Sequence, residues 1–195
     1  MLVFSLDTLK KGNRVRTPTI LQMEAVECGV ASLAMVMARY GLWVPLEELR
    51  IACGVTRDGS KASNLLKGAR TYGFSAKGFK KEPQDLASLP IPSIIHWNFN
   101  HYVVFEGIKG DRVYINDPAG GPRSVSMDEL DTSYTGVVLA FEPTSEFTQR
   151  GRAPSLVAAM GARLENAGAA VAFVVVASLL LVVPGIAIAG FSRIF

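Results

Sequence analysis

The sequence predicts an α+β fold in which helices come first and an antiparallel sheet follows. Between residues 28 and 72, apolar side chains recur every three or four positions, as on one face of a helix. Between residues 74 and 141, short runs rich in β-branched and aromatic residues are separated by turn residues. No internal repeat or low-complexity tract interrupts this order, so we expect one domain whose helices pack on the sheet.

The first of three expected helices begins near Cys28 and ends near Gly41. Its apolar face follows the i, i+3, i+4, i+7 pattern and consists of Val30, Leu33, Ala34 and Met37. Two shorter helices are expected over residues 45–52 and 62–72, and Gly73 is a typical stop for the second of them. These helices are the expected partners of the sheet.

The β-rich runs predict the strands. We expect them at residues 74–80, 93–97, 101–108, 112–116, 123–126 and 136–141, with a short helix at 128–130 before the last. The hairpin around Lys109-Gly110-Asp111 has two possible registers. With all three residues in the loop, Asp117 shares a sheet face with His101 as its diagonal neighbour. With only two residues in the loop, Asp117 points to the other face unless a bulge restores the register.

The C-terminal part of the chain is the most apolar. The 195 residues are 49% hydrophobic with a mean hydropathy of +0.27, and the 27 residues between Glu165 and Arg193 carry no charge. As a helix they would span roughly 40 Å, more than the roughly 30 Å hydrocarbon core of a bilayer. A buried core helix is the weaker alternative, because this stretch has no polar face. Residues 166–192 are therefore predicted to cross a membrane.

These patterns divide the chain into four parts. Residues 1–15 are expected to be a flexible basic arm and not a signal peptide, because Asp7 cuts the apolar start short. Residues 16–145 form the folded domain, 146–165 a linker and 166–192 the membrane helix. Basic residues that flank a membrane span tend to stay in the cytoplasm. Three arginines precede this span, Arg150, Arg152 and Arg163, whereas only Arg193 follows it. The domain is therefore expected in the cytosol.

Cys28 is the candidate nucleophile. It lies in the first turn of its helix, where unpaired N–H groups and the positive end of the macrodipole favour thiolate over thiol. Gln22, six residues earlier, could fold back and offer its amide N–H to an oxyanion formed on an attacked carbonyl. Without other evidence, a cysteine on an amphipathic helix is more often a small buried residue of the hydrophobic core. Further residues must therefore decide whether Cys28 is a nucleophile or a core residue.

A second cluster supplies a base and its orienter. His101 begins a β-rich run, and Asp117 follows it by sixteen residues. A thiol is activated when a neighbouring base takes its proton, and that base needs a third group to fix its tautomer. Cys28, His101 and Asp117 can fill these three roles, as a thiolate and imidazolium pair oriented by a carboxylate.

Other residues with the same chemistry have plainer explanations. Cys53 lies at a helix C-terminus, where the dipole disfavours thiolate, and is expected to be a packed structural thiol. His96 lies in an apolar run and is expected to be a strand residue, although it is the alternative base if the hairpin excludes His101. Two histidines and two cysteines at these spacings do not form a metal-ligand pattern. A net charge of +3 without an arginine-rich surface gives no sign of nucleic acid binding.

Three segments carry a resemblance to a known family: Gln22-Met-Glu-Ala-Val-Glu-Cys28-Gly29, Asn100-His101-Tyr-Val-Val and Asn116-Asp117-Pro-Ala. They resemble the bacteriocin-processing, double-glycine leader peptidases, which are the papain-like N-terminal domains of peptidase-containing ABC exporters. The similarity covers roughly residues 15–145. The run from Arg16 to Cys28 is most similar to exporters associated with nitrile-hydratase-like leader peptides. One departure is Glu27, where many members have Asp.

The resemblance implies a papain-like fold and a role for each site residue. Cys28 would be the nucleophile, His101 the base, Asp117 its orienter and Gln22 the oxyanion donor. The partners implied are a precursor peptide with a double-glycine-type leader, the rest of an ABC exporter, a bilayer and a second copy of the chain. No cofactor is expected in this chain, because it has no Walker-type glycine loop. ATP would bind in an ATPase part beyond Phe195, at the bacterial inner membrane.

Three functions remain open at this stage. The first is a cysteine endopeptidase that removes the leader from a ribosomally made bacteriocin-like peptide. The second is a docking module that binds the leader and does not cleave it, although the family's binding-only branch lacks the cysteine that is present here. The third is acyl transfer from the same thiol to an acceptor other than water.

Overall fold

A computed structural model of the chain describes residues 14–57, 59–153 and 156–191. The chain divides into two compact units, Met1–Arg152 and Ala153–Phe195. The candidate site residues all belong to the first.

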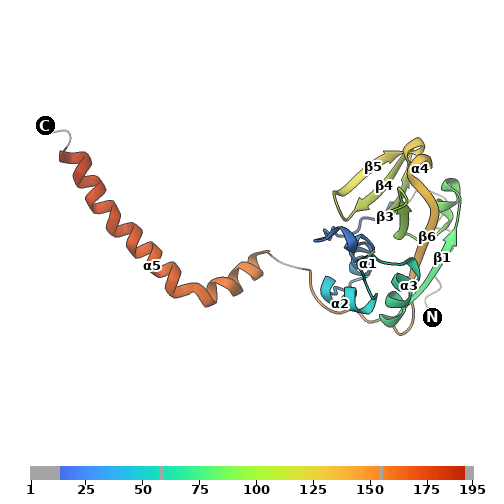
Figure 1. Ribbon diagram of the computed structural model, residues 1–195, viewed down its shortest axis with the longest axis horizontal. Coiled ribbons are helices and arrows are strands. Elements are labelled where there is room, and N and C mark those ends of the chain that lie inside the picture. Colours follow the sequence, from blue (N-terminus) through green and yellow to red (C-terminus); the bar gives the residue numbers. More distant parts are fainter. Residues whose placement is uncertain (1–13, 58, 154–155, 192–195) are drawn as a thin grey trace. The chain divides into compact units, whose positions relative to one another are not determined.

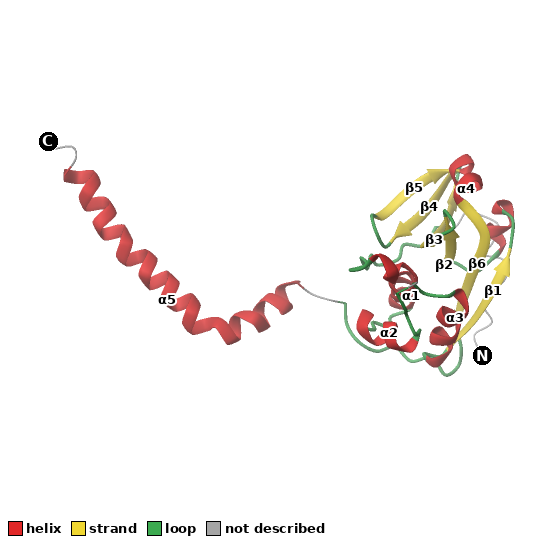
Figure 2. Ribbon diagram, viewed as in Figure 1, coloured by secondary structure: helices red, strands yellow, loops and turns green. Residues whose placement is uncertain are grey.

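The first unit contains helices followed by a sheet, as Figures 1 and 2 show. Its α-helices are α1 (Cys28–Arg39), α2 (Leu46–Ala52), α3 (Ala62–Thr71) and α4 (Met127–Ser133), and its short 3-10 helices are η2 (Ala25–Glu27) and η3 (Pro83–Ser88). Its strands are β1 (Phe74–Lys80), β2 (Ser93–Trp97), β3 (His101–Lys109), β4 (Arg112–Asp117), β5 (Gly121–Ser126) and β6 (Tyr134–Pro143). They form one sheet in the order β1-β6-β2-β3-β4-β5, in which every pairing is antiparallel.

The expected fold class is confirmed. The first two strands have the predicted bounds, and the other predicted elements of this unit differ by one to three residues at their ends. The largest differences are in α4, which ends three residues later than expected, and β5 and β6, which both begin two residues earlier. Strand pairing extends β5 back through Gly121 and Pro122, which have low β propensity, with Gly121 opposite Asp117.

Two hydrophobic cores lie on the two faces of the sheet. Figure 2 shows α1, α2 and α3 gathered together on one side of it. Their apolar residues pack with side chains of the central strands, among them Ile94, Val104 and Leu139. The alternate residues of the same strands, such as Ile95 and Val103, enter a second core with residues of η3 and α4. Of the helices, α1 is the most deeply buried, since every residue from Cys28 to Ala38 is buried.

The hairpin of β3 and β4 has the shorter of the two predicted loops. Lys109 pairs with Arg112, so only Gly110 and Asp111 form the turn. This register alone would point Asp117 to the wrong face. A bulge corrects it, because Gly107 pairs with Tyr114 and Phe105 with Ile115, which leaves Glu106 as the extra residue. Beyond the bulge, Val104 pairs with Asn116, and Asp117 comes to the face of His101.

The bulge also anchors the N-terminal segment. The Glu106 side chain is buried, and its Oε1 accepts hydrogen bonds from the backbone N–H (2.7 Å) and the hydroxyl (2.8 Å) of Thr17. Val15 donates its N–H to the Glu106 carbonyl at 2.8 Å, and Arg14 Nη2 lies 3.4 Å from Glu106 Oε2. The predicted boundary between the flexible arm and the folded domain, at residue 15, is therefore too late in the chain, because Arg14 and Val15 already contact the folded unit. Residues 1–13 lie outside the described residues.

Asn116 completes this buried network. It is fully buried, and its Nδ2 lies 3.0 Å from Thr17 Oγ1 and 3.2 Å from the Thr17 carbonyl oxygen. We expect Asn116→Ala to lower the free energy of unfolding by about 1–3 kcal/mol, because it leaves buried polar partners unsatisfied. Urea denaturation measures this. The same substitution at the exposed Asn100 should change it by less than about 0.5 kcal/mol, and equal losses at both positions would contradict this role.

Part of the expected linker also belongs to the first unit. The Phe147 ring lies 4.9 Å from that of Phe74 and 6.5 Å from that of Tyr40, in edge-on contacts. Arg150 Nη2 lies 3.1 Å from Glu48 Oε1 on α2. The segment after β6 is therefore packed against the helical side of the unit as far as Arg150, and the linker begins later than residue 146.

The second unit contains α5 (Leu156–Phe191). Its stretch Ala167–Ile186 has a mean hydropathy of 2.7 and is the one described helix long and apolar enough to cross a membrane. None of this stretch is buried within the chain. An apolar helix is therefore present where one was predicted, with Pro184 inside it, but it begins at Leu156, within the residues expected to form the linker.

Candidate active site

Cys28 occupies the N-terminus of α1, as the apolar pattern predicts. The 3-10 turn η2 leads directly into α1, and only 6% of Cys28 is exposed. The sulfur is hydrogen-bonded to the His101 side chain and to the backbone N–H groups of Tyr102 and Gly29. Ser32, one turn later on α1, donates its hydroxyl to the Tyr102 carbonyl at 3.2 Å. The helix that begins at Cys28 is therefore fixed to the strand that carries His101.

His101 and Asp117 meet across the bulged hairpin. His101 Nε2 lies 2.8 Å from Asp117 Oδ1, and the same oxygen accepts the Ala119 N–H at 2.8 Å. Because Nε2 faces the carboxylate, Nδ1 is the ring nitrogen that remains for the Cys28 thiol. The structure thus brings the three residues into the order thiol, imidazole, carboxylate.

The ionisation of these groups favours a charged pair. Burial raises the pKa of Cys28, but the His101 hydrogen bond and the N–H of Tyr102 outweigh it and hold this pKa below its ordinary value. The hydrogen bonds to Asp117 and Cys28 raise the pKa of His101 to about 9, against the effect of burial. Burial also raises the pKa of Asp117, but the bonds to His101 and the Ala119 N–H, together with the charges of His101 and Arg123, outweigh it and hold this pKa below its ordinary value. Both shifts favour the thiolate and the imidazolium over the neutral thiol and imidazole.

This ion pair predicts a bell-shaped pH profile for kcat/KM. Activity should rise as the pH passes upward through the lowered pKa of Cys28, because the thiolate forms. It should fall as the pH passes upward through about 9, because His101 then loses the proton that the leaving amine needs. Initial cleavage rates between pH 5 and 10 measure both limbs. An alkaline limb near the ordinary histidine pKa of 6.5 would contradict the link between His101 and Asp117.

Gln22 lies beside the carboxylate end of this group. Its backbone N–H donates to the Pro118 carbonyl at 2.9 Å, directly after Asp117 in the chain. Its side-chain Oε1 is buried and has no hydrogen-bond partner among the described residues. The backbone of Gln22 is therefore held beside Asp117, and its amide oxygen is enclosed without a partner among the described residues.

The two alternative residues, His96 and Cys53, are engaged elsewhere in the fold. His96 Nδ1 lies 2.8 Å from Thr135 Oγ1, and its ring packs 5.0 Å from that of Tyr102. Burial and the charge of His101 lower the pKa of His96, so it is a neutral strand residue. Cys53 is 2% exposed at the C-terminus of α2, and burial raises its pKa to about 11. Both expectations for these residues agree with the structure.

Arg123 is a member of the site surroundings that the sequence analysis missed. It lies on β5, its guanidinium stacks 5.5 Å from the Trp97 ring centroid, and its charge helps to lower the pKa of Asp117. Arg123 Nη1 also pairs with Glu129 Oε1 at 2.7 Å. Only the pairing of β4 with β5 brings Arg123 near Asp117, so no local sequence signal could have identified it.

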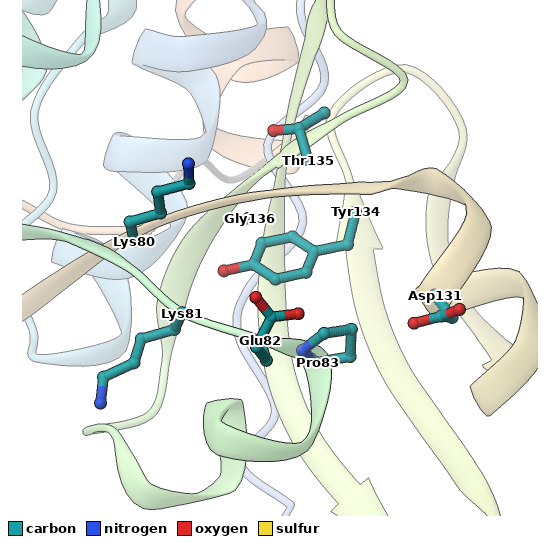
Figure 3. A pocket seen from close by; sticks show the side chains of 8 residues that line it. All are labelled: Lys80, Lys81, Glu82, Pro83, Asp131, Tyr134, Thr135 and Gly136. Atoms are coloured by element: carbon teal, nitrogen blue, oxygen red, sulfur yellow. The ribbon is translucent and has the colours of Figure 1, made fainter.

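A separate hollow lies beside β6, as Figure 3 shows. Its volume is about 210 Å³, and its lining includes Lys80, Lys81, Glu82 and Tyr134. The Tyr134 hydroxyl is buried without a partner among the described residues, and burial together with Glu82 raises its pKa to about 12. None of the triad residues lines this hollow.

Comparisons with known proteins agree with this geometry. The model of the Peptidase C39 family matches residues 16–146. The Escherichia coli colicin V secretion/processing ATP-binding protein CvaB is 36% identical over 132 residues, which are 68% of this chain and 19% of that protein. The lactococcin-G-processing and transport ATP-binding protein LagD of Lactococcus lactis is 34% identical over 134 residues, 66% of this chain and 19% of that protein. This chain thus spans about a fifth of the length of these relatives.

Solved structures are similar over the same region. A double glycine motif protease from an AMS/PCAT transporter, in complex with the leader peptide, is 57% identical with a TM-score of 0.66. The match covers 68% of this chain and 95% of that one. The peptidase domain of Streptococcus ComA, at 24% identity and a TM-score of 0.62, is matched over its full length and 66% of this chain. At that identity the likeness shows the fold alone.

Proposed function

Since this chain belongs to the peptidase C39 family, we propose that its first unit is a cysteine endopeptidase that removes a double-glycine-type leader from a ribosomally made, bacteriocin-like peptide. The observation that carries the proposal is the hydrogen-bonded series Cys28, His101 and Asp117. The 57% identical protease, described as a double glycine motif protease in complex with a leader peptide, supports the substrate class.

The proposed reaction has two halves. The Cys28 thiolate attacks the carbonyl carbon of the second residue in the small-residue pair, and the Gln22 amide and a backbone N–H near Cys28 hold the oxyanion. His101 gives its proton to the leaving amine, which releases the mature peptide and leaves a thioester on Cys28. Water, deprotonated by His101, then opens the thioester and frees the leader. Asp117 keeps the imidazole in the required orientation throughout.

Cleavage of a synthetic precursor tests this function. Residues 1–152 are a suitable protein, because the 57% identical solved chain consists almost entirely of the matching domain, so a domain of this kind folds by itself. We expect two fragments separated after the Gly-Gly pair, with the leader released as a free acid. Binding without cleavage would support the docking module, and a leader joined to another acceptor would reveal acyl transfer. A precursor with Val-Val in place of Gly-Gly is the control and should remain whole.

A narrower substrate class follows from the segment between Arg16 and Cys28. Its resemblance to exporters associated with nitrile-hydratase-like leader peptides supports the proposal that the natural precursor carries such a leader. A competition assay with equal amounts of a nitrile-hydratase-like leader precursor and a short bacteriocin-type precursor separates the two classes. The nitrile-hydratase-like precursor should have the higher kcat/KM. Equal values would reject this narrower class and leave the peptidase function intact.

We further propose that the chain is the front of a peptide exporter at the bacterial inner membrane. The relatives are named as secretion or transport and processing ATP-binding proteins, and the apolar stretch Ala167–Ile186 fits a first membrane helix. Residues 16–145 would then lie in the cytosol, with ATP bound in an ATPase part beyond Phe195 and two copies in the exporter. Proteolysis of inverted and right-side-out vesicles tests the orientation, since only inverted vesicles should lose the peptidase domain.

A further inference from the structure

A buried carboxylate ties the candidate oxyanion donor to the nucleophile. Glu27 directly precedes Cys28, and only 2% of it is exposed. Its Oε2 accepts the backbone N–H of Met23 at 2.8 Å and that of Glu24 at 2.9 Å. Its side chain thus closes a loop over residues 23–27, which begins one residue after Gln22 and ends one residue before Cys28.

This closure fixes the backbone on both sides of Gln22. The peptide group that follows Gln22 carries the Met23 N–H and is held by Glu27. The peptide group that precedes Gln22 carries its own N–H and is held by the Pro118 carbonyl at 2.9 Å. Because both flanking peptide planes are hydrogen-bonded, the direction in which the Gln22 side chain leaves the backbone is set. Either bond alone would leave one of these planes free to rotate.

Arg50 makes the buried charge of Glu27 tolerable. Its Nη1 lies 3.0 Å from Glu27 Oε1, and its Nη2 lies 3.8 Å from the exposed Glu24. A buried carboxylate without a cation or hydrogen-bond donors would be costly. With Arg50 on one oxygen and two N–H groups on the other, Glu27 is fully engaged and directs no free oxygen toward the Cys28 sulfur. Helix α2 therefore supports the loop without touching the reacting atoms.

We propose that Glu27 is a positioning residue for the oxyanion-binding amide of Gln22, with Arg50 as its support. This inference rests on the proposed function, in which Gln22 donates to the oxyanion. Oxyanion donors act on the transition state and are sensitive to displacement, since a shift of about 1 Å can cost about 10²-fold in rate. Loss of the Glu27 carboxylate should therefore lower kcat and leave KM nearly unchanged.

A double-mutant cycle tests whether Glu27 acts through Gln22. We expect Glu27→Gln to lower kcat for leader cleavage by about tenfold or more, with KM within about twofold. On a Gln22→Ala background, which itself should lose about 10²-fold in kcat, the same substitution should have no further effect. Independent, multiplicative losses would overturn the proposal, because they would mean that Glu27 contributes without Gln22.

Two matched measurements separate this role from general effects. Glu48→Gln is the matched control, because it also replaces a glutamate by glutamine, but at an exposed position on α2. Glu48 pairs with Arg150 at 3.1 Å, and its replacement should leave kcat unchanged. Alkylation of Cys28 by iodoacetamide needs the thiolate but forms no oxyanion, so its rate should be unchanged in Glu27→Gln. A tenfold fall in alkylation would overturn the proposal, since Glu27 would then act on the thiol.

The outcomes also distinguish this proposal from the proposed function. If the wild-type domain does not cleave a leader, the peptidase function fails, whereas full activity of Glu27→Gln rejects only the positioning role. Should Glu27→Gln not fold, as judged by thermal unfolding, Glu27→Asp replaces it in the cycle. Glu27→Asp keeps the negative charge but has a side chain shorter by one methylene. The substitution should therefore lower kcat about threefold in the wild-type background and should not lower it in the Gln22→Ala background. Equal falls in both backgrounds would reject the proposal.

Discussion

Replacement of Cys28 by alanine is expected to abolish leader cleavage while the leader still binds. The thiolate forms the covalent bond in the proposed reaction, and neither His101 nor water can replace it at the same position. Loss of the nucleophile in a triad costs about 10⁴-fold to 10⁶-fold in kcat. Chromatography of the precursor measures cleavage, and fluorescence anisotropy of a labelled leader measures binding.

Cys53→Ala is the matched control for this prediction. The two cysteines are both buried and free, but Cys53 lies at the C-terminus of α2 with its pKa raised to about 11. Its replacement should leave cleavage unchanged. Cleavage by Cys28→Ala at more than about a hundredth of the wild-type rate would show that the thiol is not the nucleophile.

Asp117→Ala is expected to cause the second largest loss, about 10²-fold to 10⁴-fold in kcat. Without Oδ1, the His101 ring loses the partner that fixes its orientation at 2.8 Å, and its proton is no longer stabilised by a carboxylate. The alkaline limb of the pH profile should therefore move down from about 9 toward the ordinary histidine value of 6.5. Rate measurements between pH 5 and 10 reveal both effects.

Asp117→Asn separates orientation from charge. The amide oxygen can still accept the Nε2–H of His101, so the loss in kcat should be smaller than in the alanine variant. The alkaline limb should move down in both variants, because both remove the negative charge. If the limb stayed near 9 in both, Asp117 would not be the group that raises the pKa of His101.

The helices and strands of the first unit could be predicted because their signals are local. The apolar period of α1 fixes its start at Cys28, which is also what places the thiol at a helix N-terminus. The three candidate residues Cys28, His101 and Asp117 could be chosen from their residue types and from the family resemblance. Their geometry could not be predicted, because the hairpin register depends on whether the loop has two or three residues.

The bulge at Glu106 decides that geometry. Its one available sequence signal is the Gly107 that follows, which has φ +118° and therefore a conformation that other residues rarely adopt. A glycine within a strand pattern often marks a bulge. The partners of Glu106 could not be predicted, since Thr17 lies 89 residues away in the chain. The contact of Arg50 with Glu27 is likewise set by how α2 packs beside the loop.

The reaction of a leader peptide that ends in Gly-Gly-chloromethyl ketone tests the central claim most directly, because it requires leader recognition and an activated thiol at once. Peptide mapping by mass spectrometry locates the adduct. We predict one adduct, on Cys28. It should form much more slowly in the His101→Ala variant than in the wild type, and much more slowly with a chloromethyl ketone that lacks the leader than with the leader reagent. An adduct on Cys53, no adduct at all, or an equal rate in His101→Ala would contradict a peptidase built on Cys28, His101 and Asp117.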